Sequence, residues 1–423
     1  MLSQLSPEIK IAIVGLGYVG LPLALAFAEK YQVKGFDLNT QRINALREGT
    51  DQTNQVSKEE LSSSKLQITN QASELADCQI YIITVPTPVD QHKKPNLEPL
   101  LSASKAIGGM LKNGDVIIYE STVYPGCTEE DCVPILEQGS GLRYNQDFFC
   151  GYSPERISPG DPIRTLKNII KITSGSNAEV ASLVNDLYAS IITAGTFQAS
   201  SIKVAEASKA IENAQRDVNI SFVNELALIF DKMEIDTTEV LEAASTKWNF
   251  LNFKPGLVGG HCIGVDPYYL SYKAEKLGYV PRVILSGREV NDQMASFVVN
   301  KCLKLMVQKN VQPIGAKALV MGISFKENCP DIRNSKVIDI ITELKQFGLE
   351  VDVHDPLVSK EEVLDMHEIS LIEDIYREDY QLIILAVAHQ EFLGIDFGKL
   401  KKGDTVLFDT RSVLKRAWVD GRL

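Results

Sequence analysis

The stretch KIAIVGLGYVGLPLALAFAEKYQVKGFD, residues 10–37, decides the fold of the first part of the chain. An almost wholly apolar run predicts a buried strand, and a helix is expected over about 19–31 before a second strand that ends at Asp37. Gly15, Gly17 and Gly20 form G-x-G-x-x-G between strand and helix, which is the dinucleotide-binding fingerprint. These glycines allow a tight turn, close approach of a pyrophosphate, and packing of the helix on the strand.

Asp37 lies 17 residues after Gly20, where a carboxylate accepts hydrogen bonds from the adenosine ribose. A carboxylate there repels a 2′-phosphate, so the sequence favours NAD over NADP. The alternative, a glycine turn that only aids packing, does not explain why strand, helix and acidic residue occur together. The predicted cofactor contacts in this region are Gly15, Gly17, Tyr18, Val19, Gly20, Asp37 and Arg42.

Composition limits the classes of protein to which the chain can belong. With 423 residues and a net charge of −12, the chain predicts two or three globular domains and argues against nucleic-acid or anionic-membrane partners. The seven cysteines are scattered without a C-x-x-C pair, and no apolar run reaches the length of a membrane span. We therefore expect a cytoplasmic protein that uses no metal.

Strands alternate with helices in two separate regions, which predicts parallel sheets built from βαβ units. Further strands are expected at 79–85, 115–121 and 168–175, and again at 316–325, 349–355, 380–388 and 404–409. From Ser200, about 35 residues lack Gly and Pro and show helical periodicity. The fold class is therefore α/β, with two Rossmann-like domains (1–199 and 313–423) joined by a helical domain (200–312).

Several motifs outside the glycine turn contain reactive or polar side chains. VPTP (85–88) and ESTVYPG (120–126) follow predicted strands, where Thr87 and Thr122 are candidates for contact with the cofactor or a water, although turn chemistry alone is an equal explanation. A Pro-rich loop holds Glu155 and Arg156, a weak signal by itself. In the long helix Lys209 and Asn213 lie at i and i+4, where two donors can stabilise an alkoxide.

Cys262 lies in VGGHCIGVDPYYL, residues 258–270, among three glycines that leave space for a ligand. Spacing alone leaves a nucleophile and a buried packing residue as equal interpretations. Asp266 is a better candidate than the adjacent His261 for positioning a proton or a water.

Together these motifs, with GISFKENCPDIRNS (322–335), closely resemble the UDP-glucose/GDP-mannose dehydrogenase family over essentially the whole chain. The resemblance is strongest to the branch that oxidises UDP-N-acetylhexosamines (GlcNAc or GalNAc) for surface polysaccharides. It implies an NAD-dependent, four-electron oxidation of the sugar C6 alcohol to a carboxylate, through a thiohemiacetal and a thioester on Cys262. Glu120 and His261 differ from the UDP-glucose branch, which concerns substrate identity.

The resemblance also implies roles for individual residues. Cys262 is the nucleophile, Lys209 and Asn213 stabilise oxyanions, Asp266 with Thr122 organises the water, and Glu155 is an acid/base or water-holding partner. The implied substrate contacts are Glu155, Arg156, Lys209, Asn213, His261, Gly264, Lys326 and Arg411, and Arg333 is a further cofactor contact. The long helix is expected to form the core of a homodimer interface.

Two alternatives remain open from the sequence. One is oxidation of UDP-ManNAc or UDP-glucose by the same route, because the orientation of one hydroxyl is not legible in a single chain. The other is a two-electron NAD-dependent sugar or hydroxy-acid dehydrogenase in which Cys262 is structural.

Overall fold

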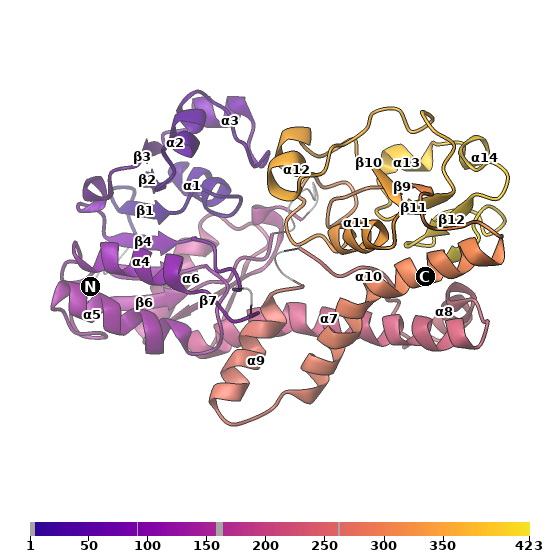
Figure 1. Ribbon diagram of the computed structural model, residues 1–423. Coiled ribbons are helices and arrows are strands. Elements are labelled where there is room, and N and C mark those ends of the chain that lie inside the picture. Colours follow the sequence, from indigo (N-terminus) through magenta and orange to yellow (C-terminus); the bar gives the residue numbers. More distant parts are fainter. Residues whose placement is uncertain (1–4, 91, 158–163, 261–262) are drawn as a thin grey trace. The chain divides into compact units, whose positions relative to one another are not determined.

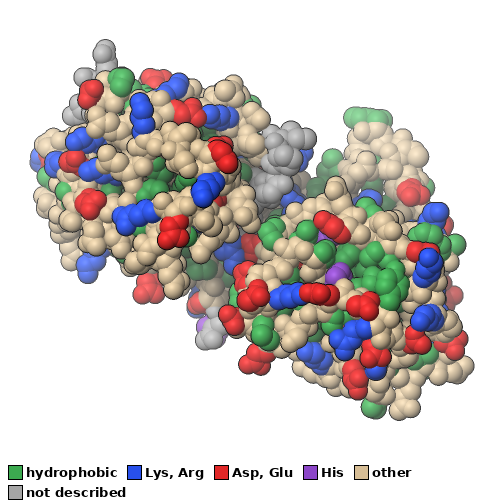
Figure 2. All heavy atoms as spheres, turned by 90° about the horizontal axis from the view of Figure 1, so that it is seen from above, with side chains coloured by type: hydrophobic (Ala, Val, Ile, Leu, Met, Phe, Trp, Pro, Cys, Tyr) green, Lys and Arg blue, Asp and Glu red, His purple; other side chains and the backbone are tan. Residues whose placement is uncertain are grey.

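The computed structural model describes residues 5–90, 92–157, 164–260 and 263–423. Its contacts divide the chain into two compact units, the first of residues 1–212 and 268–279 and the second of residues 213–267 and 280–423. Figure 1 shows the helices and strands of both. Within the described residues, no helix combines the length and apolarity needed to cross a membrane. On the face shown in Figure 2, acidic and basic side chains are interspersed.

The first unit is built on an eight-stranded sheet in the order β3-β2-β1-β4-β5-β6-β7-β8. The strands are β1 (Lys10–Val14), β2 (Gln32–Phe36), β3 (Gln67–Thr69), β4 (Ile80–Ile83), β5 (Val116–Tyr119), β6 (Phe149–Tyr152), β7 (Lys171–Gly175) and β8 (Thr196–Gln198). Neighbours run parallel except β6 and β7, which are antiparallel. The parallel α/β fold class is confirmed, and β3, β6 and β8 are strands that the sequence analysis did not predict.

Helices cover both faces of this sheet. These are α1 (Gly20–Ala28), α2 (Thr40–Arg47), α3 (Lys58–Ser63), α4 (Glu98–Gly108), α5 (Val133–Ser140) and α6 (Ala178–Ala189), with short helical turns η1 (Ala72–Leu75), η2 (Thr128–Cys132) and η3 (Leu166–Asn168). Apolar side chains of α1 and α6 share one core with those of β1, β4 and β5. Elsewhere α4 and α5 approach closely at Gly108 and Gly139, where an added Cβ would meet the other helix's backbone.

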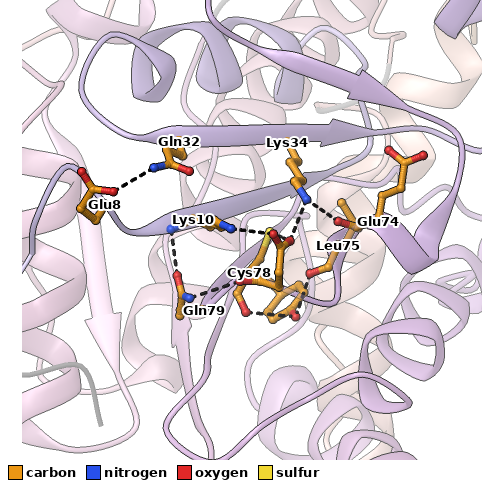
Figure 3. A network of polar contacts seen from close by, with 10 residues as sticks. Glu8, Lys10, Gln32, Lys34, Glu74, Leu75, Cys78 and Gln79 are labelled. Atoms are coloured by element: carbon orange, nitrogen blue, oxygen red, sulfur yellow. Dashed lines mark hydrogen bonds and ion pairs between the residues drawn. The ribbon is translucent and has the colours of Figure 1, made fainter.

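Charged side chains close the amino ends of the central strands, opposite the edge where a parallel sheet binds ligands (Figure 3). Lys10 of β1 and Lys34 of β2 each place Nζ 2.7 Å from the carboxylate of Asp77. Hydrogen bonds from these lysines lower the pKa of Asp77 to about 2. Both lysines are paired with the same carboxylate, so these contacts tie β1 and β2 to the turn before β4.

The second unit contains a five-stranded parallel sheet in the order β10-β9-β11-β12-β13. The strands are β9 (Lys317–Met321), β10 (Glu350–His354), β11 (Leu382–Leu385), β12 (Val406–Asp409) and β13 (Gly421–Arg422). Alternate residues of β9 enter two different cores, one shared with α10 (Arg282–Gln308) and α11 (Val337–Gln346), the other with α13 (Gln390–Leu393) and α14 (Phe397–Leu400). Both faces are therefore buried, as expected for a parallel sheet. Two further helices are α8 (Thr237–Ser245) and α12 (Lys360–His367).

The long helix expected from Ser200 is α7 (Ile202–Lys232), 31 residues in length. Ser201 caps it by accepting a hydrogen bond from the Val204 amide at 3.2 Å. Two helices, α9 (Asp266–Lys276) and α10, also lie within the helical region expected over 200–312. They are separate because Gly278 takes φ +79° between them and Pro281 precedes α10.

A buried polar network joins α7 to α10 within the second unit. Asp217 accepts hydrogen bonds from Arg288 (2.6 Å) and Asn291 (2.7 Å). Asn291 in turn accepts one from Asn224, whose side chain also exchanges hydrogen bonds with the backbone of Gly256. Desolvation raises the pKa of Asp217, so its charge depends on the guanidinium that neutralises it.

We predict that Arg288→Met destabilises the protein by about 3 kcal/mol, because a buried carboxylate loses its partner. Urea unfolding followed by circular dichroism measures the change. The control is Arg143→Met, since Arg143 pairs with Asp147 on the surface and its side chain is 69% exposed. A loss below about 1 kcal/mol for Arg288→Met, the range of surface pairs, would show that the network is not needed for stability.

Candidate active site

The turn between β1 and α1 has the shape that a dinucleotide requires. Gly15 has φ +100°, and a Cβ on Gly20 would lie 1.8 Å from the Gly15 carbonyl oxygen, so neither position accepts a side chain. A Cβ on Gly17 would meet no atom within 4 Å, which leaves its backbone open to an incoming phosphate. The half-buried Tyr18 and Val19 lie between these glycines and the first turn of α1.

Two predicted cofactor residues hold this turn from β2 and α2. The Asp37 carboxylate accepts hydrogen bonds from the amides of Leu16 (2.9 Å) and Asn39 (2.9 Å), and the residue remains half-buried at the end of β2. Arg42 is only 6% exposed; its Nε donates to the Leu16 carbonyl at 3.0 Å and its guanidinium lies 2.7 Å from Asp51. Asp37 is thus placed for a ribose, whereas Arg42 supports the turn from within.

The loops after β4 and β5 are tied together by side chains of the two threonine motifs. The Thr87 hydroxyl donates to the Thr122 carbonyl at 2.7 Å, and the Ser121 hydroxyl donates to the Val85 carbonyl at 2.6 Å. Tyr269 of α9 adds a third tie, because its hydroxyl donates to the Thr87 carbonyl at 2.8 Å. The two threonines therefore lie together at the carboxyl edge of the sheet.

Glu120, in the same loop, is only 2% exposed. Its carboxylate lies 2.7 Å from Lys171 Nζ and accepts a hydrogen bond from the Tyr188 hydroxyl. The sequence analysis connected Glu120 with substrate identity, and in the structure its contacts anchor the loop after β5.

Two buried polar pairs lie along α7, each containing one predicted oxyanion-stabilising residue. In the first unit, Lys209 Nζ is 3.9 Å from the Glu155 carboxylate. In the second unit, Asn213 Nδ2 donates to the Asp266 carboxylate at 2.5 Å. All four residues are at most 6% exposed. Lys209 and Asn213 are one helical turn apart, so α7 presents an ammonium and an amide in sequence, each with an acidic partner.

Cys262 and His261 lie outside the described residues, and the two glycines before them lie within. A Cβ on Gly259 would lie 2.4 Å from the Asn334 carbonyl oxygen, and one on Gly260 would lie 2.6 Å from the Phe325 ring. Gly260 also has φ +80°. The interpretation that these glycines make room for a ligand was wrong for Gly259 and Gly260, because the chain's own 325–334 segment occupies that space.

The predicted nucleotide-sugar residues of the second unit lie at the carboxyl edge of its sheet. Lys326 is exposed in the loop after β9, and Arg411 follows β12. Glu327 joins the two loops, because its carboxylate lies 2.5 Å from Arg411 Nε. Arg333 is exposed and paired with Asp331 at 2.7 Å. Gly264 is half-buried just before α9.

Arg156 belongs to the first unit, where its guanidinium lies 2.7 Å from Glu212 of α7 and donates to the Ile170 carbonyl. These bonds fix the loop that carries Glu155. The residues that sequence reasoning missed are Tyr269, Glu327 and Glu206. Tyr269 and Glu327 lay in motifs already singled out, but the partners of all three residues are remote in sequence.

Glu206, one turn before Lys209 on α7, is fully buried and accepts hydrogen bonds from the amides of Gly126 (2.5 Å) and Thr128 (2.9 Å). It therefore ties α7 to the segment that follows the Thr122 motif. Desolvation raises its pKa to about 7, although the hydrogen bonds from Thr128 and Gly126 favour the charged form. In the described part of the chain, no group of three or more His, Cys, Asp or Glu side chains is placed to hold a metal ion.

The fold and the glycine turn define a dinucleotide-binding α/β protein with a second α/β unit. Three matches cover most of the chain: the NAD binding domain of the UDP-glucose/GDP-mannose dehydrogenase family (residues 9–192), its central domain (203–293) and its UDP binding domain (319–416). The chain belongs to the UDP-glucose/GDP-mannose dehydrogenase family. The predicted family and cofactor are thereby confirmed.

Named relatives extend over the full length. The chain is 54% identical to the UDP-N-acetyl-D-glucosamine 6-dehydrogenase of Pseudomonas aeruginosa, over 98% of this chain and 100% of that one. It is 51% identical to the enzyme of the same name from Salmonella typhi, over 98% and 99%. The structure matches that of the UDP-D-ManNAc dehydrogenase of Pyrococcus horikoshii with a TM-score of 0.89 and 29% identity, over 98% of each chain.

We predict that Glu206 makes stability fall as pH rises. Its pKa lies near 4.5 in an unfolded chain and at about 7 in the folded one, so the folded state binds the proton more tightly and loses that advantage across this interval. Calorimetry at about pH 5 and about pH 8 should show a smaller drop in melting temperature for Glu206→Gln than for the wild type. Equal drops would mean that the folded-state pKa of Glu206 is not raised.

Proposed function

We propose that this enzyme oxidises the C6 alcohol of UDP-N-acetylglucosamine to the carboxylate, for surface polysaccharide synthesis. The observation that carries the proposal is the buried series on α7, Lys209 with Glu155 and Asn213 with Asp266, in a chain that contains Cys262 and is 51–54% identical to enzymes named for this substrate. Hydrogen-bond donors stabilise a developing oxyanion, and carboxylates can orient a reacting water or accept its proton. The two pairs on α7 supply both kinds of group.

The chemistry proceeds in two oxidations and a hydrolysis. When bound, NAD⁺ accepts one hydride from C6 in each oxidation. Glu155 takes the proton of the alcohol, and Lys209 and Asn213 stabilise the C6 oxyanion. The Cys262 thiolate then adds to the aldehyde, so that the carbon again carries a transferable hydrogen. After the second hydride leaves, a water positioned by Asp266 and Thr122 hydrolyses the thioester and releases the thiol.

The three-domain division expected from the sequence fits this scheme. Residues 1–199 bind NAD, with Arg333 as an additional contact from the last domain. Residues 200–312 supply Lys209, Asn213, Cys262 and Asp266, while Glu155 and Thr122 come from the first domain. Residues 313–423 bind the UDP moiety with Lys326 and Arg411. His261, Gly264 and Arg156 shape the sugar end. Because nucleotide sugars and NAD are cytoplasmic metabolites, we place the enzyme in the cytoplasm.

Counting NADH tests the proposal. We expect two NADH per UDP-N-acetylglucosamine for the wild type, and loss of steady-state turnover by at least about a thousandfold in Cys262→Ser, because a serine hydroxyl is a poor nucleophile at neutral pH. UDP-N-acetylgalactosamine and UDP-N-acetylmannosamine run in parallel identify the preferred epimer. One NADH per sugar with an active Cys262→Ser variant would instead define a two-electron dehydrogenase with a structural cysteine.

The dimer expected from the sequence has a candidate interface on α7. Val204, Ile211, Phe222 and Ile229 are 45–56% exposed, and their spacing places them along one side of the helix. Exposed apolar side chains aligned along one side of a helix are typical of an association surface. We propose that two copies of the chain pack through it.

We expect Phe222→Glu to convert a dimer into a monomer in light scattering after gel filtration, because a carboxylate would be buried in an apolar contact. Phe197→Glu is the matched control, since Phe197 is 62% exposed on β8 and lies outside α7. A monomeric wild type, or a Phe222→Glu variant that remains dimeric, would rule this interface out.

A further inference from the structure

His389 is a buried histidine that the reaction does not use. It follows β11 in the second unit, is 0% exposed, and hydrogen-bonds to three residues from two other loops. One of those loops, residues 322–335, carries Lys326. A buried side chain with this many polar partners fixes the loops around it in one arrangement.

The partners determine which ring nitrogen carries the proton. The Asn328 backbone amide donates to Nδ1 at 2.9 Å, so Nδ1 is the acceptor and the proton is on Nε2. Nε2 faces the Asp355 carboxylate at 3.1 Å and the Ser324 hydroxyl at 3.2 Å. Asp355 is itself held by the amide of Ile323 at 2.8 Å, and the ring therefore joins β10, β11 and the loop after β9.

Both halves of the Lys326 turn are attached to this histidine. The Ser324 hydroxyl, which contacts His389 Nε2, donates to the backbone carbonyl of Lys326 at 2.9 Å. On the other side, the Asn328 side chain accepts a hydrogen bond from the Gln390 amide at 2.9 Å, so Asn328 is held twice by residues 389–390. Asn328 has φ +57°, a conformation that needs such support.

The same loop also contacts the segment that leads to Cys262. The Gly260 amide donates to the Asn334 carbonyl at 3.2 Å, and the Phe325 ring lies against Gly260. The loop thus connects the proposed nucleotide-binding lysine with Gly260, which precedes the proposed nucleophile by two residues.

We propose that His389 is a positioning residue for nucleotide-sugar binding. By accepting a hydrogen bond from the Asn328 amide at Nδ1, it holds the 324–328 turn in the arrangement that presents Lys326 to the diphosphate. This inference rests on the proposed function, because Lys326 is assigned there to the UDP end of the substrate.

Two isosteric variants separate positioning from general stability. The amide group of Asn occupies the place of Nδ1, and that of Gln occupies the place of Nε2. In His389→Gln the Asn328 amide loses its acceptor, and the turn populates other arrangements. The apparent affinity for UDP then falls in proportion to the fraction of molecules that keep the binding-competent turn. We expect UDP, titrated calorimetrically into the full-length protein, to bind about tenfold more weakly, with NAD affinity within about twofold of wild type.

His389→Asn restores the acceptor and should bind UDP within about threefold of wild type. His354→Gln is the matched control: His354 ends β10 and bonds to the Ile372 carbonyl at 2.8 Å. It should leave UDP affinity unchanged. Should His389→Gln fail to fold, Asn328→Gly tests the same turn at an exposed residue. It keeps the amide and tolerates the positive φ while removing the bond from Gln390, and a several-fold loss of UDP affinity is expected.

Lys326→Met separates failure of the positioning role of His389 from failure of the proposed nucleotide site. If it weakens UDP binding while His389→Gln and Asn328→Gly do not, the positioning role is overturned and the nucleotide site stands. Equal losses in His389→Gln, His389→Asn and His354→Gln would also overturn it, because they would reflect stability alone. If Lys326→Met leaves UDP affinity unchanged, both the site assignment and the inference fail.

Discussion

A carboxylate at the end of one strand holds the turn at the end of its neighbour, and both sheets depend on this interaction. In the first sheet Asp37 accepts the amide that follows Gly15, at 2.9 Å; in the second, Asp355 accepts the amide that follows Gly322, at 2.8 Å. Each glycine has a positive φ, +100° and +87°, and each donates its own amide to the neighbouring strand at 2.8 Å. Buried turn amides need such acceptors, and the turns set the direction of the loops that carry the site.

The two copies of this arrangement are used differently. Asp37 is half-buried beside the open backbone of Gly17, so its remaining acceptor capacity is available to a ribose. Asp355 is 6% exposed and bonds to His389, so its carboxylate oxygens accept their hydrogen bonds from groups within the protein. The first sheet is therefore suited to a dinucleotide and the second is not. In the second unit cations on the loops, Lys326 and Arg411, are the groups suited to a diphosphate.

The sequence predicted those parts of the fold and site that depend on local pattern. Apolar runs located β1, β4 and β9, and the glycine spacing located the cofactor turn, because a single stretch of chain determines each of these features. Strand β6 was missed because its FCGY sequence is short and leads into a Pro-rich loop. The ties made by Glu206 and His389 were invisible for another reason: their partners are 34 to 80 residues away, and one sequence contains no record of which distant polar groups a buried side chain will meet.

The glycines before Cys262 show why a glycine-rich sequence by itself does not tell whether a segment lines an open pocket. A glycine-rich stretch is compatible with an open pocket or with close packing of two backbones, and the two demand opposite surroundings. At Gly259 and Gly260 the surroundings are the Asn334 carbonyl and the Phe325 ring, so any side chain would push the 325–334 segment away. The backbone approaching the cysteine is thereby held against the loop that presents Lys326. In the proposed mechanism a thiolate meets C6 while the diphosphate is bound at a fixed distance along the same substrate. Contact between these two segments would then give the protein a direct means of fixing that distance.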